Sequence, residues 1–209
     1  GSSNSAFGRD ALRANTTGTQ NVAVGTAAMT ANTTAVNSVA VGYNSLLSNL
    51  TGDSNTAVGT SALKTTTGAE NTGIGAAALE LNSSGVNNVA LGYAALYANT
   101  TASNNTAVGK SALSANTTGT QNVALGAYAG DAITTASYNT AVGTYALSTN
   151  VLGSRNTAIG RDALFAVNSS SAADMYNSAV GFGAGALVTS GVRNTMIGGL
   201  AGNTTTTGQ

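Results

Sequence analysis

The sequence predicts an all-β protein, a parallel β-solenoid of about twelve coils with 17 residues each. Two observations carry this prediction: a short Asn-Thr-Ala-Val-Gly motif recurs along the whole chain, and the residues between its copies have turn chemistry. Nine of the eleven intervals between the glycines that close the motif are 17 residues, one is 16 and one is 21. Such a fixed period is typical of solenoid proteins. These motif glycines are Gly8, Gly25, Gly42, Gly59, Gly75, Gly92, Gly109, Gly126, Gly143, Gly160, Gly181 and Gly198.

Residues at the same position of successive repeats form columns with distinct chemistry. The residue before the motif glycine is always apolar, the one before that is small in eleven repeats, and the fourth after it is Leu or Met in nine. A Thr- and Val-rich motif favours a strand, and Asn-Thr-Thr-Gly favours a turn. Each repeat is therefore predicted to form one coil with two short strands and two turns. At about 4.8 Å per coil, twelve coils make a rod on the order of 58 Å long.

Alternation along a strand places Thr56 and Val58 on one side and Asn55 and Ala57 on the other. Since Val58 is the larger apolar residue, we expect it inside the coil together with Leu63. The Ala57 column then faces outward, and its small size is explained if another subunit approaches closely in a symmetric oligomer. The predicted interface residues are Ala23, Ala40, Ala57, Ala90, Ala107, Ala124, Ala141 and Ala158.

The motif resembles that of a known family. Residues 37–42, Asn-Ser-Val-Ala-Val-Gly, are similar to the Asn-Ser-Val-Ala-Ile-Gly motif of the YadA-like head repeats of trimeric autotransporter adhesins, and similar repeats occur in phage tail fibres. The resemblance covers residues 4–209 and implies a left-handed β-roll that assembles as a homotrimer and binds a host cell-surface protein or glycan. The family repeat is commonly nearer 14 residues, and we attribute the extra ones here to the Asn-Thr-Thr-Gly turn. The motif is structural, so no ligand residue carries over from it.

A single domain is expected over residues 4–209, with residues 1–3 a cloning remnant and the chain a piece of a longer protein. Seven Lys/Arg balance seven Asp/Glu, which argues against nucleic-acid binding. Without His or Cys, and with carboxylates at different repeat positions, we predict no catalysis, no metal site and no cofactor. No apolar run is long enough to insert into a membrane. The expected role is an extracellular adhesive or structural fibre segment on a cell surface or virion.

Several residues are candidates for ligand binding or modification. Tyr43, Tyr93 and Tyr97 are the predicted contact residues, because aromatic rings suit sugar and protein surfaces. An alternative is ice binding by a threonine row of Thr17, Thr34, Thr101, Thr118 and Thr135, and a passive spacer is the third. The Asn that opens each motif is predicted to form a ladder of amides between coils. A second Asn column in Asn-x-Ser/Thr sequence, with Asn15, Asn32, Asn49, Asn82, Asn99 and Asn116, allows either turns or glycans. The 21-residue repeat is expected to place a loop over residues 168–176.

Overall fold

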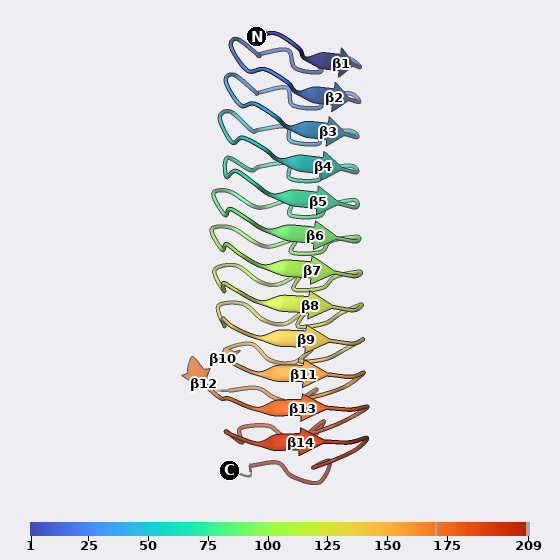
Figure 1. The fold of residues 1–209 in the computed structure, drawn as a ribbon, viewed down its shortest axis with the longest axis vertical. Helices are drawn as coiled ribbons and strands as arrows, with labels where there is room; N and C mark the ends of the chain where they lie inside the picture. Colours follow the sequence, from blue (N-terminus) through green and yellow to red (C-terminus); the bar gives the residue numbers. More distant parts are fainter. Residues whose placement is uncertain (170, 208–209) are drawn as a thin grey trace.

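Each repeat contributes one three-residue strand, and these strands stack in sequence order into a single parallel sheet. In the computed structural model, which describes residues 1–169 and 171–207, the sheet has twelve strands. The chain advances by one strand per repeat along a straight rod, with the two termini at opposite ends (Figure 1). Twelve strands joined by eleven connections make about eleven full turns, which confirms the parallel β-solenoid.

The bounds of the strands follow the motif. The large sheet contains β1 (Ser5–Phe7), β2 (Val22–Val24), β3 (Val39–Val41), β4 (Thr56–Val58), β5 (Thr72–Ile74), β6 (Val89–Leu91), β7 (Thr106–Val108), β8 (Val123–Leu125), β9 (Thr140–Val142), β11 (Thr157–Ile159), β13 (Ser178–Val180) and β14 (Thr195–Ile197). A small second sheet pairs β10 (Gly153–Ser154) with β12 (Ala173–Asp174). None of the elements in the described part of the chain is a helix that could span a membrane.

The prediction of two strands per repeat is wrong for most coils, because the side opposite the sheet is a stack of turns. Ala94 and Leu96 have φ values of +54° and +51°, so the chain cannot extend there. Its amides still bond to the next coil: Leu96 N–H donates to Ala112 O at 3.0 Å, and Ala98 N–H to Ser114 O at 3.0 Å. Hydrogen bonds between coils thus continue around the rod without a second regular sheet.

The alternation along the strand is as predicted, but its orientation is inverted. Ala57 and Asn55 are fully buried inside the coil, while Thr56 and Val58 face outward. Beside a core leucine, the interior leaves little room in this column: a Cβ added at Gly73 would already lie 3.2 Å from the Leu63 Cγ. The predicted subunit interface is therefore wrong, because residues enclosed in their own coil cannot meet another chain. This correction applies to Ala23, Ala40, Ala57, Ala90, Ala107, Ala124, Ala141 and Ala158.

The column four residues after the motif glycine fills most of the core, as expected for Leu63. Its members are fully buried in most coils. Where this column holds Gly130 instead, Ile133 three residues later occupies the vacated space, and a Cβ added at Gly130 would lie 3.0 Å from the Ile133 Cδ1. Met196, the exception in the Ala column, likewise packs against Gly185 and Gly202. The total side-chain volume in the core is thus kept constant, because a small residue in one column is offset by a large residue in another.

The Asn that opens each motif forms the predicted ladder. Asn105 accepts a hydrogen bond from the Asn122 N–H at 2.9 Å through its Oδ1, and its Nδ2 donates to Gly119 O at 2.9 Å. Ser38, which replaces Asn in one repeat, keeps the first of these bonds by accepting from the Asn55 N–H through its Oγ. Each buried amide side chain therefore fastens its coil to the next by satisfying backbone groups.

The Asn column in the sequons is a second internal ladder. The Nδ2 of Asn99 donates to Asn82 Oδ1 at 2.8 Å and to Ala102 O at 3.0 Å, and the side chain is fully buried. Asn32, Asn49, Asn82 and Asn116 are equally buried. Since a glycan requires an accessible amide nitrogen, these asparagines form turns and cannot carry glycans in this fold.

Residue 170 of the loop predicted over residues 168–176 lies outside the described part of the chain. Residues 171–176 leave the regular coil, and β13 then pairs with β11 in register. β12 lies beside the column of coils, on the side opposite the arrows of the large sheet (Figure 1). The side chain of Met175 turns inward and packs against Gly153.

The N-terminal residues belong to the first coil. Ser3 adopts a φ of +58°, close to the +60° of Gln20 at the same repeat position. Ser3 thus has the backbone conformation of its repeat position.

Candidate functional site

A hollow of about 540 Å³ opens on the turn side of the rod, beyond the carboxyl ends of β5, β6 and β7. Three coils contribute to it, and its floor is one column of small residues, Ala77, Ala94 and Ser111. The column three residues further along each coil gives Glu80, Tyr97 and Ser114. The complete lining is Ala77, Glu80, Tyr93, Ala94, Tyr97, Ser111, Ser114 and Ala115.

The hollow exists because the floor column is small in these three coils. In the next two coils the same column carries Tyr128 and Tyr145, whose rings stack 5.3 Å apart with an interplanar angle of 9°. The ammonium of Lys110 lies 5.3 Å from the centre of the Tyr128 ring. Large side chains in this column therefore close the hollow on the side of β8.

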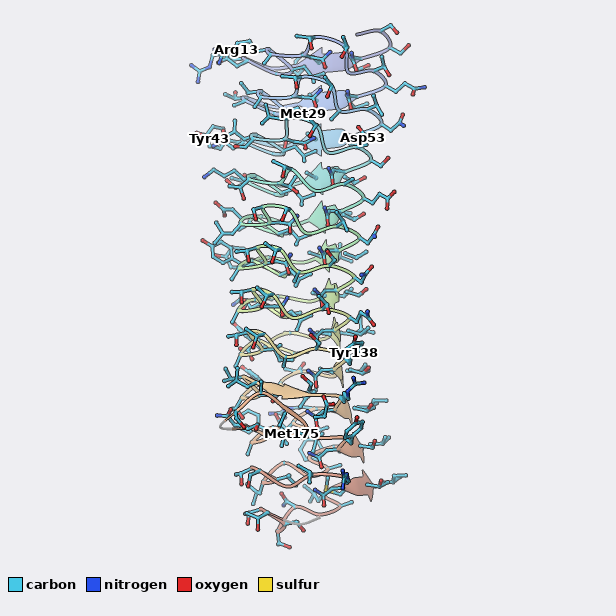
Figure 2. All side chains as sticks on the ribbon, turned by 90° about the vertical axis from the view of Figure 1, so that its left-hand side faces the viewer. Arg13, Met29, Tyr43, Asp53, Tyr138 and Met175 are labelled. Atoms are coloured by element: carbon cyan, nitrogen blue, oxygen red, sulfur yellow. The ribbon has the colours of Figure 1, made fainter. Side chains whose placement is uncertain are left out.

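The structure brings two of the three predicted contact tyrosines together. Tyr93 and Tyr97 line the hollow from the same coil, and their exposed fractions are 59% and 38%. Tyr43 occupies the same repeat position as Tyr93 but follows β3, three strands away in the sheet. It points outward on its own, away from the rod (Figure 2). The predicted set thus divides into a pair in the hollow and a solitary ring.

Polar groups in the hollow comprise one carboxylate and several hydroxyls. Glu80 is mostly covered, with 18% of its side chain exposed, and its Oε1 lies 3.5 Å from the Lys64 Nζ. Within the described chain, the hydroxyls of Ser111 and Ser114 make no hydrogen bond to another protein group. They remain available to a ligand, and the carboxylate can accept hydrogen bonds from it.

Two groups near the hollow titrate away from their usual range. The pKa of Lys110 is raised, chiefly by its hydrogen bond to the Tyr128 side chain. Burial raises the pKa of Asp131, and the Ser148 hydroxyl, which donates to its Oδ1 at 2.6 Å, opposes that effect. Lys110 directly precedes Ser111 at the edge of the hollow, whereas Asp131 lies in the next coil. The carboxylate inside the hollow is that of Glu80.

The outer face of the large sheet, which the sequence-based interpretation placed in the core, is exposed and carries a continuous apolar column. It consists of two columns, the residues on either side of the buried Ala in each strand. Leu91 and Ile159 are 43% and 39% exposed, and Val22 and Val89 are exposed in the neighbouring column. A clue was present in the sequence: this column varies among Phe, Val, Ile and Leu, whereas the enclosed column is nearly all Ala.

The threonine row predicted for ice binding is exposed but lies in turns. Thr17, Thr34, Thr101, Thr118 and Thr135 all face solvent. The preceding residue in each pair turns its hydroxyl to the next coil, as when Thr100 Oγ1 donates to Thr117 O at 3.0 Å. Only one hydroxyl of each threonine pair therefore faces water, in a single row outside the sheet. Ice binding stays a prediction, which a thermal-hysteresis measurement tests.

A second aromatic cluster contacts β12, the additional strand of the 21-residue repeat. The Arg155 guanidinium lies 4.6 Å from the ring centre of Tyr138 and 5.7 Å from that of Tyr176. Its Nε is 3.0 Å from the Asp174 Oδ2, and this contact raises the pKa of Arg155. Tyr138 points from the side of the rod opposite Tyr43 (Figure 2). The ion pair and the two cation–π contacts hold β12 against the neighbouring coils.

The described residues include no cluster of three or more His, Cys, Asp or Glu side chains that could hold a metal ion. Two of the carboxylates sit beside the preceding arginine on the surface: Arg9 Nε is 3.8 Å from Asp10 Oδ2, and Arg161 Nε is 3.3 Å from Asp162 Oδ2. Exposed pairs of this kind contribute little to stability.

Comparison with known proteins returns no match: no family model, no curated protein and no solved structure aligns significantly with the chain. The functional argument therefore rests on the geometry of the repeat, its exposed sheet face and the hollow.

Proposed function

We propose that this chain is a segment of an extracellular adhesive fibre, and that it assembles as a homotrimer through the outer face of its large sheet. In this proposal the coil is left-handed, as in the head repeats that the motif resembles. Three solenoids side by side form a rigid shaft, and their turn surfaces display binding positions to a host cell.

The exposed apolar sheet face is the observation that carries the proposal. Twelve strands present one outward column of Phe, Val, Ile and Leu along the whole rod. The second outward column holds Val in four strands and Thr or Ser in the other eight. Extended apolar patches on soluble proteins mark interaction sites, because their contact with water is unfavourable. A rotationally symmetric assembly would cover the same face on every copy without leaving one exposed.

Repetition supports the display role. Sites repeated on three parallel subunits engage a surface together, so that weak individual contacts add through a high effective concentration. The internal Asn ladders and the continuous hydrogen bonds between coils give the rod the rigidity that such display requires.

Analytical ultracentrifugation tests the assembly. We expect a trimer at micromolar concentration, and we expect the double variant Leu91→Lys and Val108→Lys to dissociate, because it places two charges per subunit in an apolar contact. Thr118→Lys, on the exposed threonine row, is the matched control and should remain trimeric. A wild-type monomer, or a trimer indifferent to the two sheet-face lysines, would refute this part of the proposal.

Binding of fluorescently labelled rods to cells, together with a glycan array, tests the adhesive part. We expect saturable binding that weakens when the rods are made monomeric by the sheet-face lysines. Trimeric rods that bind neither cells nor any glycan would indicate a passive spacer instead.

A further inference from the structure

We propose that the hollow beside Tyr93 and Tyr97 is a binding site for a neutral oligosaccharide of two to three sugar units. This inference rests on the proposed display function and names the ligand class and the position at which it binds. Other coils repeat the architecture around the hollow but not the combination of side chains that lines it.

The size of the hollow fits such a ligand. Its volume of about 540 Å³ lies within the range of pockets that hold small organic molecules. It extends over three coils, which at about 4.8 Å per coil give a length close to that of two or three linked sugar rings. The site is on the turn side, so the sheet face remains free for assembly.

The two tyrosines supply the apolar contact that a sugar requires. One face of a pyranose ring carries several C–H bonds, and these pack against the face of an aromatic ring. Tyr93 and Tyr97 lie on either side of the floor residue Ala94 along one coil, and both rings are substantially exposed. Exposed rings with a small residue between them leave room for a flat ligand to lie against them.

The polar groups match the hydroxyls of the same ligand. The Glu80 carboxylate accepts hydrogen bonds, and Ser111 and Ser114 both donate and accept. Glu80 is the only carboxylate in the lining, and the Lys64 ammonium 3.5 Å from its Oε1 balances its charge. The hollow therefore carries no excess charge that would select an acidic sugar over a neutral one.

The coils after the hollow limit the extent of the site along the rod. At the floor position, the coils after the hollow carry Tyr128 and Tyr145, whose stacked rings take up the equivalent space. The coil of Tyr43 has a solitary ring without the second tyrosine four residues later. The floor tyrosines and the solitary Tyr43 therefore indicate which substitutions to test.

Titration with maltotriose, cellotriose and chitotriose, followed by saturation-transfer NMR, tests the proposal. We expect at least one of the three to bind with a Kd on the order of 1 mM. Tyr97→Ala and Tyr93→Ala should each weaken that binding by about tenfold or more, as for aromatic anchors in general. Ala94→Tyr, which copies the residue found at Tyr128, should abolish binding while the chain stays folded.

Tyr43→Ala is the matched control, because it removes a ring at the same repeat position as Tyr93 but outside the hollow. The affinity of this variant for the trisaccharide should equal that of the wild type. The proposal fails if none of the three trisaccharides binds at about 10 mM, if Ala94→Tyr binds normally, or if sialyllactose binds more tightly than the neutral probes. Sedimentation of the same samples separates the two proposals: a trimer without sugar binding refutes the site, and a monomer that binds sugar refutes the assembly.

Discussion

At the scale of single residues, the motif glycine has two independent reasons to lack a side chain. Gly109 has a φ of +132°, a conformation that L-residues with a side chain rarely adopt. A Cβ added there would also lie 2.6 Å from the carbonyl carbon and oxygen of Gly126 in the next coil. The backbone strain arises within one coil, whereas the steric clash arises between two neighbouring coils.

Alanine substitutions separate these two effects. Gly109→Ala should cost about 2–6 kcal/mol, because conformational strain of ~1–3 kcal/mol adds to overpacking of similar size. Gly198→Ala should cost only the strain, since Gly198 has a φ of +121° but no heavy atom within 4 Å of an added Cβ. Hydrogen exchange of the strand amides, followed for each coil, measures the loss of stability in both variants. Gly199→Ala, with neither constraint, is the control. Equal losses at Gly109 and Gly198 would show that the clash contributes nothing.

At the scale of one coil, the core is shared between two columns that compensate each other. Leu113 and Asn116 represent the common arrangement, in which the apolar residue fills the core and the amide joins the second ladder. Gly130 and Ile133 represent the exchanged arrangement in the next coil. The exchange interrupts the ladder, and the Oδ1 of Asn116 is left without a hydrogen-bond partner inside the protein.

A double-mutant cycle on Gly130 and Ile133 tests this compensation. Gly130→Leu alone should destabilise by overpacking against Ile133, and Ile133→Asn alone by opening a void, each by about 2–4 kcal/mol. The double variant recreates the arrangement of Leu113 and Asn116, so we expect a favourable coupling of about 1–3 kcal/mol in urea denaturation. Strictly additive losses would contradict the idea that the two columns share one volume.

The same columns show what the sequence can and cannot determine about a coil. Spacing alone predicts the strand, the turn, Leu63 in the core and the Asn ladder, because each depends on residue type and period. It leaves the sidedness of Ala57 and Val58 undetermined, since alternation defines two faces without saying which is enclosed. The larger residue is outside here because Leu63 and two amide columns already fill a narrow interior. Likewise, the shared repeat position of Tyr43 and Tyr93 predicts orientation but not proximity, and three coils put about 14 Å between their positions.

At the scale of the whole molecule, each coil contacts only its neighbours along the rod. The strand pairing joins equal columns throughout, as in Val22 with Val39 and Val39 with Thr56. Stability of such an array is approximately a sum of coil terms and nearest-neighbour interfaces. A coil can therefore be removed without disturbing distant ones, provided that every column stays in register.

Deletion of residues 26–42 tests this. It removes one complete 17-residue coil, joins Gly25 to Tyr43, and stacks Asn21 directly on Asn55 in the amide ladder. We expect a folded rod about 4.8 Å shorter, with an unchanged circular-dichroism signature and only a modest drop in the denaturation midpoint. Deletion of residues 26–33 is the control. It leaves too few residues between Gly25 and Gly42 to close a coil, so it should unfold at least the flanking repeats. If the 17-residue deletion is as damaging as the eight-residue one, the coils depend on more than their immediate neighbours and the additive description fails.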